Sequence, residues 1–156
     1  MSLFALIKLV HILSAAVLFG TGAGIAFFML QAHRTGRAEV VAATARIVVL
    51  ADFLFTAPAV ILQPFSGVAL AAIQGYRLFE PWLVWAWALY LLIGACWLPV
   101  VVIQLRIRRL AEAAVAQGAP LPAAYHRLFR VWFILGWPAF AGVVAVYGLM
   151  ITRPVL

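Results

Sequence analysis

Four long apolar stretches, at about residues 3–30, 47–73, 81–104 and 129–152, constrain this chain more than any other feature. The hydrocarbon core of a bilayer is about 30 Å thick and is crossed by roughly 20 apolar residues in a helix. A membrane barrel would instead show segments of about ten residues with alternating polarity, and the sequence has no such pattern. We therefore predict an all-α integral membrane protein, a four-helix bundle that forms a single transmembrane domain over residues 1–156.

The composition points to the same class of protein. Hydrophobic residues make up 68% of the chain and charged residues 10%, whereas a soluble domain is about half apolar and a quarter charged. The first stretch lacks a basic leader and exceeds the roughly 7–15 apolar residues of a signal peptide, so we expect it to remain as a helix. The formal charge of +7 lies mostly in loops beside the membrane, so nucleic acid is not an expected partner.

The distribution of basic residues predicts the orientation. Eight lie in the segments between the first and second and between the third and fourth stretches, and three lie on the other side. The positive-inside rule then places both arginine-rich segments in the cytoplasm and both termini outside, on the periplasmic side of a bacterial inner membrane. The three on the outer side are Lys8, Arg77 and Arg153.

A polar stripe runs along the second stretch. Asp52, Thr56, Gln63 and Ser66 fall within about 80° of one another on a helical wheel. A charged residue at depth costs from about 3 kcal/mol upward, so such residues face a bundle interior or a wet cavity. Asp52 is then either a salt-bridged or helix-capping residue near the arginine-rich segments, or a carboxylate that handles protons or binds a ligand.

The first stretch carries a ridge of small residues, Ala16, Gly20 and Gly24. Small residues at this spacing let another helix approach closely. The neighbour is another helix of the same chain, a second copy of the protein, or a membrane partner subunit.

His11 is the candidate cofactor ligand. Lys8 can extend its ammonium group to the outer headgroups, which leaves His11 one turn deeper, and Met150 lies at a similar depth one turn from Arg153. Imidazole and thioether groups are axial ligands of haem iron in cytochromes. His11 as an interhelical hydrogen-bonding residue, and His11 as a proton relay, are the alternatives.

Aromatic residues and glycines supply candidate walls for such a site. Tyr90 and Trp97 share one inclined face of the third stretch, and Gly22 lies on the same side of the first stretch as His11. These residues would line a pocket for a planar ligand, either haem b with His11 as its metal ligand or a quinone. An aromatic stripe at this spacing is also typical of an ordinary packed core.

The chain resembles the bacterial predicted integral membrane protein family known as domain of unknown function 2269. The resemblance rests on "KLVHIL", "ADFLFTAPAVILQPFSG", "ACWLPVVVIQLRIR", "GWPAFAG" and "LMITRP". Members typically have a lysine where this chain has Arg153. The resemblance to this family implies a four-helix membrane fold and no established activity. The opening Lys8-x-x-His11 is also similar to that of small haem-associated membrane proteins of the copper-resistance D and membrane protoporphyrinogen oxidase types.

Motifs that would identify an enzyme are absent. The sequence has no P-loop, no H-E-x-x-H and no nucleophile elbow, and "GTGAG" at 20–24 follows no strand. Three roles therefore stand: a redox or accessory protein that binds haem b or quinone, a non-catalytic subunit or assembly factor, and a proton-coupled carrier of small solutes along the polar stripe.

Overall fold

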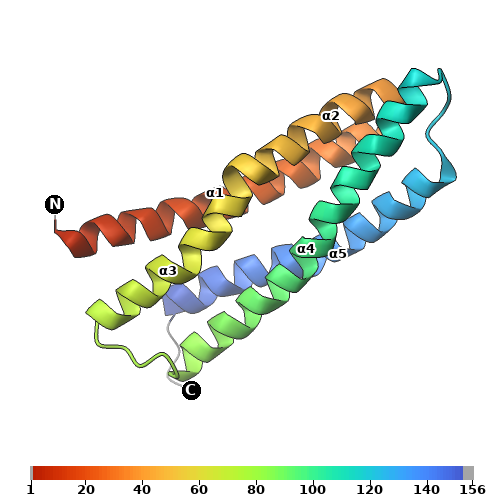
Figure 1. Cartoon of the computed structure of the whole chain (residues 1–156). Helices are drawn as coiled ribbons and strands as arrows, with labels where there is room; N and C mark the ends of the chain where they lie inside the picture. Colours follow the sequence, from red (N-terminus) through yellow and green to blue (C-terminus); the bar gives the residue numbers. More distant parts are fainter. Residues whose placement is uncertain (1, 153–156) are drawn as a thin grey trace.

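The chain forms long helices joined by short connections (Figure 1). The computed structural model describes residues 2–152, and every regular element in them is helical. Helices α2, η1 and α3 follow one another directly, so four helical segments are long and apolar enough to cross a membrane. The predicted all-α, four-helix membrane fold is confirmed in these terms. The elements are α1 (Leu3–Arg34), α2 (Ala38–Ala51), η1 (Asp52–Thr56), α3 (Ala57–Ile73), α4 (Pro81–Ala116) and α5 (Ala123–Thr152).

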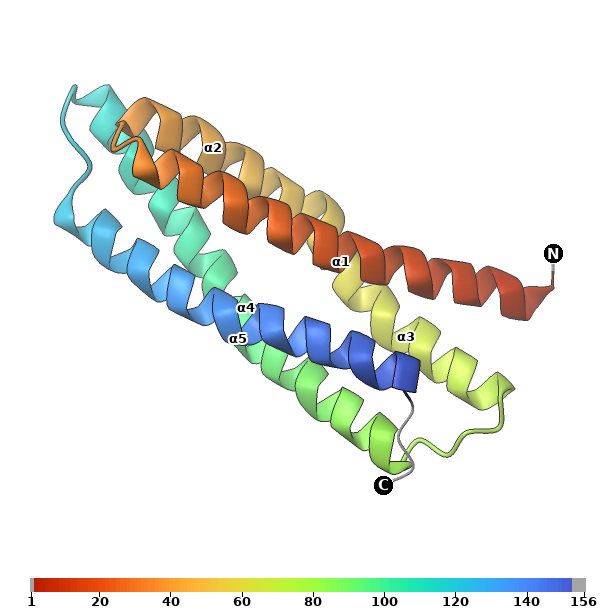
Figure 2. The ribbon, with the colours of Figure 1, turned by 180° about the vertical axis from the view of Figure 1, so that it is seen from behind.

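The segments are arranged as an elongated bundle (Figures 1 and 2). Helix α1 packs mainly on α3 and α2, whereas α4 packs mainly on α5 and α2. The start of α1 and the end of α5 lie at the end of the bundle opposite the connections at 35–37 and 117–122 (Figure 1). We call the end with these connections the arginine-rich end. Its location in the cytoplasm stays a prediction.

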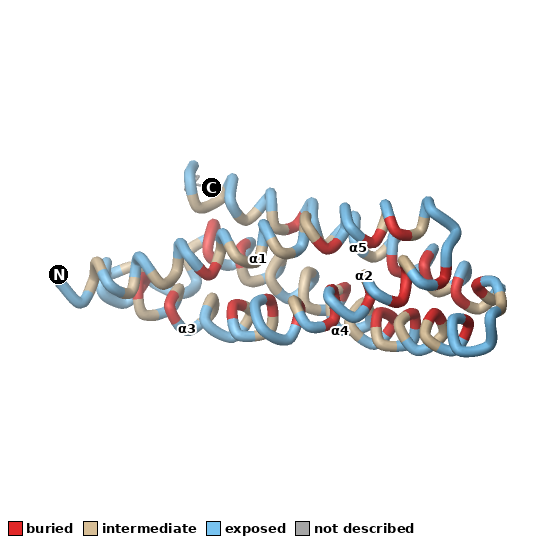
Figure 3. The backbone as a smooth tube through the Cα atoms, turned by 90° about the horizontal axis from the view of Figure 1, so that it is seen from above, coloured by how far each residue is buried: buried red, intermediate tan, exposed pale blue. Residues whose placement is uncertain are grey.

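Most of the buried core lies at the arginine-rich end. Met29, Val41, Ile107 and Tyr125, from α1, α2, α4 and α5, are almost completely buried there. The opposite end has a much smaller cluster of buried residues, formed by Ala71, Trp82 and Leu83. Figure 3 shows that burial is confined to the sides where helices face each other, while the outward sides are exposed. Many outward residues are large and apolar, as lipid contact requires.

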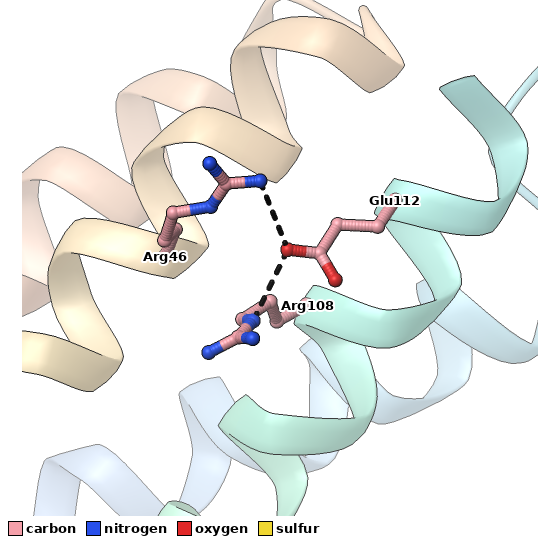
Figure 4. A network of polar contacts seen from close by, with 3 residues as sticks. All are labelled: Arg46, Arg108 and Glu112. Carbon is pink, nitrogen blue, oxygen red and sulfur yellow. Dashed lines mark hydrogen bonds and ion pairs between the residues drawn. The ribbon is translucent and has the colours of Figure 1, made fainter. Parts of the chain in front are cut away.

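An ionic cluster joins α2 to α4 at the arginine-rich end (Figure 4). Glu112 Oε1 accepts hydrogen bonds from Arg46 at 3.4 Å and from Arg108 at 3.1 Å. Both arginine side chains are substantially exposed, so each ion pair contributes at most about 1 kcal/mol to stability. The two guanidinium groups share one carboxylate, which leaves the cluster with a net positive charge.

The second segment contains a π-helical turn, η1, that ends two residues before Pro58. The backbone N–H of Ala57 donates to the carbonyl of Asp52, five residues earlier. Proline has no N–H to donate to the carbonyl four residues before it, so regular α-helical bonding is already interrupted here. A π turn holds more residues than an α turn, and residues beyond it lag behind the α-helical phase. The part of the polar stripe within η1 and the part beyond it therefore meet different neighbours.

Candidate functional site

His11 and Ser66 join α1 to α3 in the half of the bundle away from the arginine-rich end. The Nδ1 atom of His11 lies 2.8 Å from Ser66 Oγ. Ser66 is buried and His11 is half-buried. The polar stripe thus reaches the candidate cofactor ligand, a contact that places two of the sequence-predicted site residues in one hydrogen-bonded pair.

The hydrogen bonds of Ser66 favour one tautomer of the His11 ring. The hydroxyl of Ser66 donates to the carbonyl of Leu62 at 2.6 Å, with the carbonyl of Gln63 at 3.2 Å. A hydroxyl has one proton, so Ser66 can only accept from His11. With that proton on the Leu62 carbonyl, the Nδ1 atom of His11 is the N–H donor. In the neutral ring this leaves Nε2 with a free lone pair, the state in which histidine binds metals.

Gly67 lies against the ring of His11, whereas Gly22 lies farther along α1. A Cβ atom on Gly67 of α3 would lie 3.4 Å from His11 Cε1, so the ring packs directly on this backbone. Gly22, three turns along α1 from His11, has nothing within 4 Å of its Cβ position. His11 meets α3, and the ring of Phe19 lies 5.3 Å from that of Phe140 on α5. On a helical wheel, Gly22 lies between His11 and Phe19. The side of α1 between its two neighbours is therefore open at Gly22.

Tyr90 links α4 to α3 through a backbone carbonyl. Its hydroxyl donates to the carbonyl of Val60 at 2.6 Å. Residue 64, four positions after Val60, is a proline and cannot donate to that carbonyl. Tyr90 therefore supplies the hydrogen bond that Pro64 leaves missing. This occupies the hydroxyl group of a residue that the sequence assigns to the wall of a ligand pocket.

A second polar cluster surrounds Asp52, at η1. The side chains of Thr56, Trp97 and Gln104 face its carboxyl group. Asp52, Thr56 and Gln104 are each more than nine-tenths buried. Asp52 Oδ2, Thr56 Oγ1, Trp97 Nε1 and Gln104 Oε1 are nevertheless buried without a hydrogen-bond partner among the described residues. Buried polar atoms in proteins are rarely left unpaired, so the cluster around Asp52 is suited to a bound water, ion or polar ligand.

The remaining predicted residues occupy separate places. Gln63 is half-buried, and its Oε1 atom is buried without a partner within the described chain. Trp97 belongs to the Asp52 cluster. Met150 packs against the Ala71, Trp82 and Leu83 cluster. Arg153 lies outside the described residues.

The ridge of small residues on α1 is open. Ala16 and Gly20 are exposed and Gly24 is half-buried. No atom lies within 4 Å of the Cβ position of Gly20, and at Gly24 the nearest atom belongs to Phe28 of the same helix. Within the described chain, no helix packs closely on this ridge.

Sequence reasoning missed two parts of the polar interior. Gln104 was recognisable as part of an inclined face of α4, but helical periodicity does not say which helix that face meets. The pair formed by His33 Nδ1 and the hydroxyl of Tyr125, 3.0 Å apart, joins α1 to α5 at the arginine-rich end. The similar depth of these two residues in the first and fourth spans, which run in opposite directions, was the available signal.

Comparison with known proteins places the chain in a family but not in a functional class. A family model described as a predicted integral membrane protein, domain of unknown function 2269, matches residues 5–154. No curated protein and no solved structure matches the chain.

Proposed function

We propose a function for this chain, which belongs to the predicted integral membrane protein family, domain of unknown function 2269. In this proposal it is a redox or accessory protein that binds haem b through His11. Haem b would supply one-electron transfer within the membrane. A quinone in the same space is the alternative planar ligand. The bacterial inner membrane is the proposed location.

The hydrogen bond between His11 and Ser66 is the observation that carries this proposal. Metal-binding histidines usually donate their second ring N–H to an oxygen atom, which fixes the tautomer and the direction of the ring. Ser66 Oγ occupies this role at 2.8 Å from Nδ1. Because its own proton goes to the carbonyl of Leu62, the arrangement favours a ring with Nε2 available for iron.

The open side of α1 supplies further support. Gly22 carries no side chain to fill the space between the contacts of α1 with α3 and with α5. Met150 remains the proposed second axial ligand. It packs near the end of α3, in the same half of the bundle as Ser66. Tyr90 and Trp97 contribute to the walls in this proposal through their rings, while the hydroxyl of Tyr90 is bonded to α3.

Haem titration of the purified protein tests the assignment. We expect Ser66→Ala to weaken haem binding by about 10–100-fold, the usual cost of losing such a supporting hydrogen bond. Ser14→Ala is the matched control. Ser14, on α1, is buried like Ser66, but its hydroxyl bonds to the backbone carbonyl of His11 and not to the imidazole ring. Equal affinities for the two variants would exclude the proposed role of Ser66.

The Asp52 cluster favours a second candidate function, a proton-coupled carrier. Asp52, Thr56 and Gln63 would form its polar path, since each has a buried polar atom without a partner in the described chain. Proton-driven solute uptake into proteoliposomes, compared between the wild type and Asp52→Asn, distinguishes this role. Uptake that is unchanged by the substitution would exclude it.

The exposed ridge favours a third, a non-catalytic subunit or assembly factor. Gly20 has open space where another helix would pack, and the occupant would be a second copy or a membrane partner. Purification in a mild detergent, followed by a mass measurement of the intact complex, tests this role.

A further inference from the structure

A pocket of about 340 Å³ lies between α1 and α5 at the arginine-rich end. It is independent of both polar clusters described above. Its lining residues are Leu30 and His33 from α1, and His126, Phe129, Arg130 and Phe133 from α5. The pocket is partly open to the surroundings.

The pocket lining combines cationic or hydrogen-bonding side chains with apolar side chains. The apolar ones lie on the membrane side of the pocket. Leu30, Phe129 and Phe133 belong to the apolar stretches, whereas His33 and His126 lie just beyond them. Arg130 is exposed, and its guanidinium group can extend toward the headgroup region. One end of the pocket is therefore suited to hydrocarbon and the other to a polar headgroup.

His33 is held in a fixed position at the pocket. Its Nδ1 atom lies 3.0 Å from the hydroxyl of the fully buried Tyr125. Its ring stacks on Phe129, with the ring centres 3.8 Å apart and the planes 7° from parallel. The pocket wall is thus pre-ordered, which lowers the entropy cost of binding a ligand.

The positive charge of Arg130 is not balanced by an acidic residue of the chain. The four acidic residues are Glu39, Asp52, Glu80 and Glu112. Of these, Glu39 lies beside Arg37, and Glu112 is shared by two arginines. No ion pair within the described residues involves Arg130. An anion from outside the chain is therefore the natural counterion at this pocket.

We propose that this pocket binds the headgroup of an anionic glycerophospholipid. The phosphate oxygens accept hydrogen bonds from Arg130, whose planar guanidinium group suits phosphate, and from a ring N–H of His126. The acyl chains leave the pocket along Leu30, Phe129 and Phe133 into the bilayer. Basic pockets between membrane helices are a recognised form of lipid site.

Native mass spectrometry of the full chain in detergent tests the proposal, with phosphatidylglycerol and phosphatidylcholine as the added lipids. We expect the wild type to retain phosphatidylglycerol about fivefold more than phosphatidylcholine, and Arg130→Gln to remove most of this preference. Arg127→Gln is the matched control. Arg127 is an exposed arginine of the same helix that does not line the pocket, so the preference should change by less than about twofold.

Three outcomes would overturn the proposal. Equal retention of both lipids by the wild type would show that the pocket does not recognise the headgroup charge. Equal losses in Arg130→Gln and Arg127→Gln would assign the preference to general surface charge. Displacement of phosphatidylglycerol by inorganic phosphate at the same concentration would assign the site to free anions rather than to lipid.

Discussion

Tyr90 donates a 2.6 Å hydrogen bond to the carbonyl of Val60, the group that Pro64 leaves without a donor in its own helix. In lipid no water is available to satisfy that carbonyl, so the bond between α4 and α3 compensates for the proline. The pair also shows how a helix break and an aromatic residue of a neighbouring helix act together to fix the half of the bundle that contains His11.

Replacement of Tyr90 by phenylalanine should destabilise the protein by about 1–3 kcal/mol, because it leaves the partly buried carbonyl of Val60 without a partner. Thermal or denaturant unfolding in detergent measures this change. Tyr147→Phe is the control, since Tyr147 is exposed and its ring packs edge-on against that of Phe19. A loss of stability that is no larger for Tyr90→Phe than for Tyr147→Phe would contradict the role of the bond.

Replacement of Asp52 by asparagine should not lower stability and should raise the Tm by a few degrees. The amide keeps the shape of the carboxyl group and removes an ionisable group from a buried site. Thermal unfolding in detergent tests this. A Tm several degrees below that of the wild type would mean that the carboxylate holds a cation or an ion pair.

The ridge on α1 predicts an assembly larger than one chain. Gly20→Leu should reduce the mass of the complex in mild detergent, because a leucine side chain would block close helix approach. Gly136→Leu is the matched control, as Gly136 on α5 is also exposed with nothing within 4 Å of its Cβ position. Identical masses for the wild type and Gly20→Leu would argue against a partner at this ridge.

The predicted orientation can be tested with single cysteines, since the native Cys96 is buried. A membrane-impermeant maleimide should label Gln74→Cys in intact spheroplasts, and Gln117→Cys only after permeabilisation. Both residues are exposed and directly follow a helix, one at each end of the bundle. The reverse labelling pattern would place the arginine-rich end outside.

The number and nature of the helices follow from the sequence because the membrane imposes a minimum apolar length on each span. The inward direction of Asp52, Thr56 and Ser66 also follows, since lipid contact would be costly for each. All three are buried in the structure. These properties depend on local composition and on helical periodicity alone.

The partners of these residues could not be predicted in the same way. The π turn at Asp52–Thr56 changes the phase of the helix, so one stripe meets α4 through Asp52 and α1 through Ser66. Nor does a helical wheel reveal that Trp97 faces Asp52. Both facts depend on how four helices pack together, which periodicity within one helix does not encode.

Absorption spectra of the purified protein, from cells supplied with haem precursors, test the central claim most directly. A ring of His11 held by Ser66 with Nε2 free should give the wild type a Soret band and a change on reduction, and both should be lost in His11→Ala while the protein remains folded. A wild-type protein without a Soret band, or a His11→Ala variant with an unchanged spectrum, would contradict haem binding at His11.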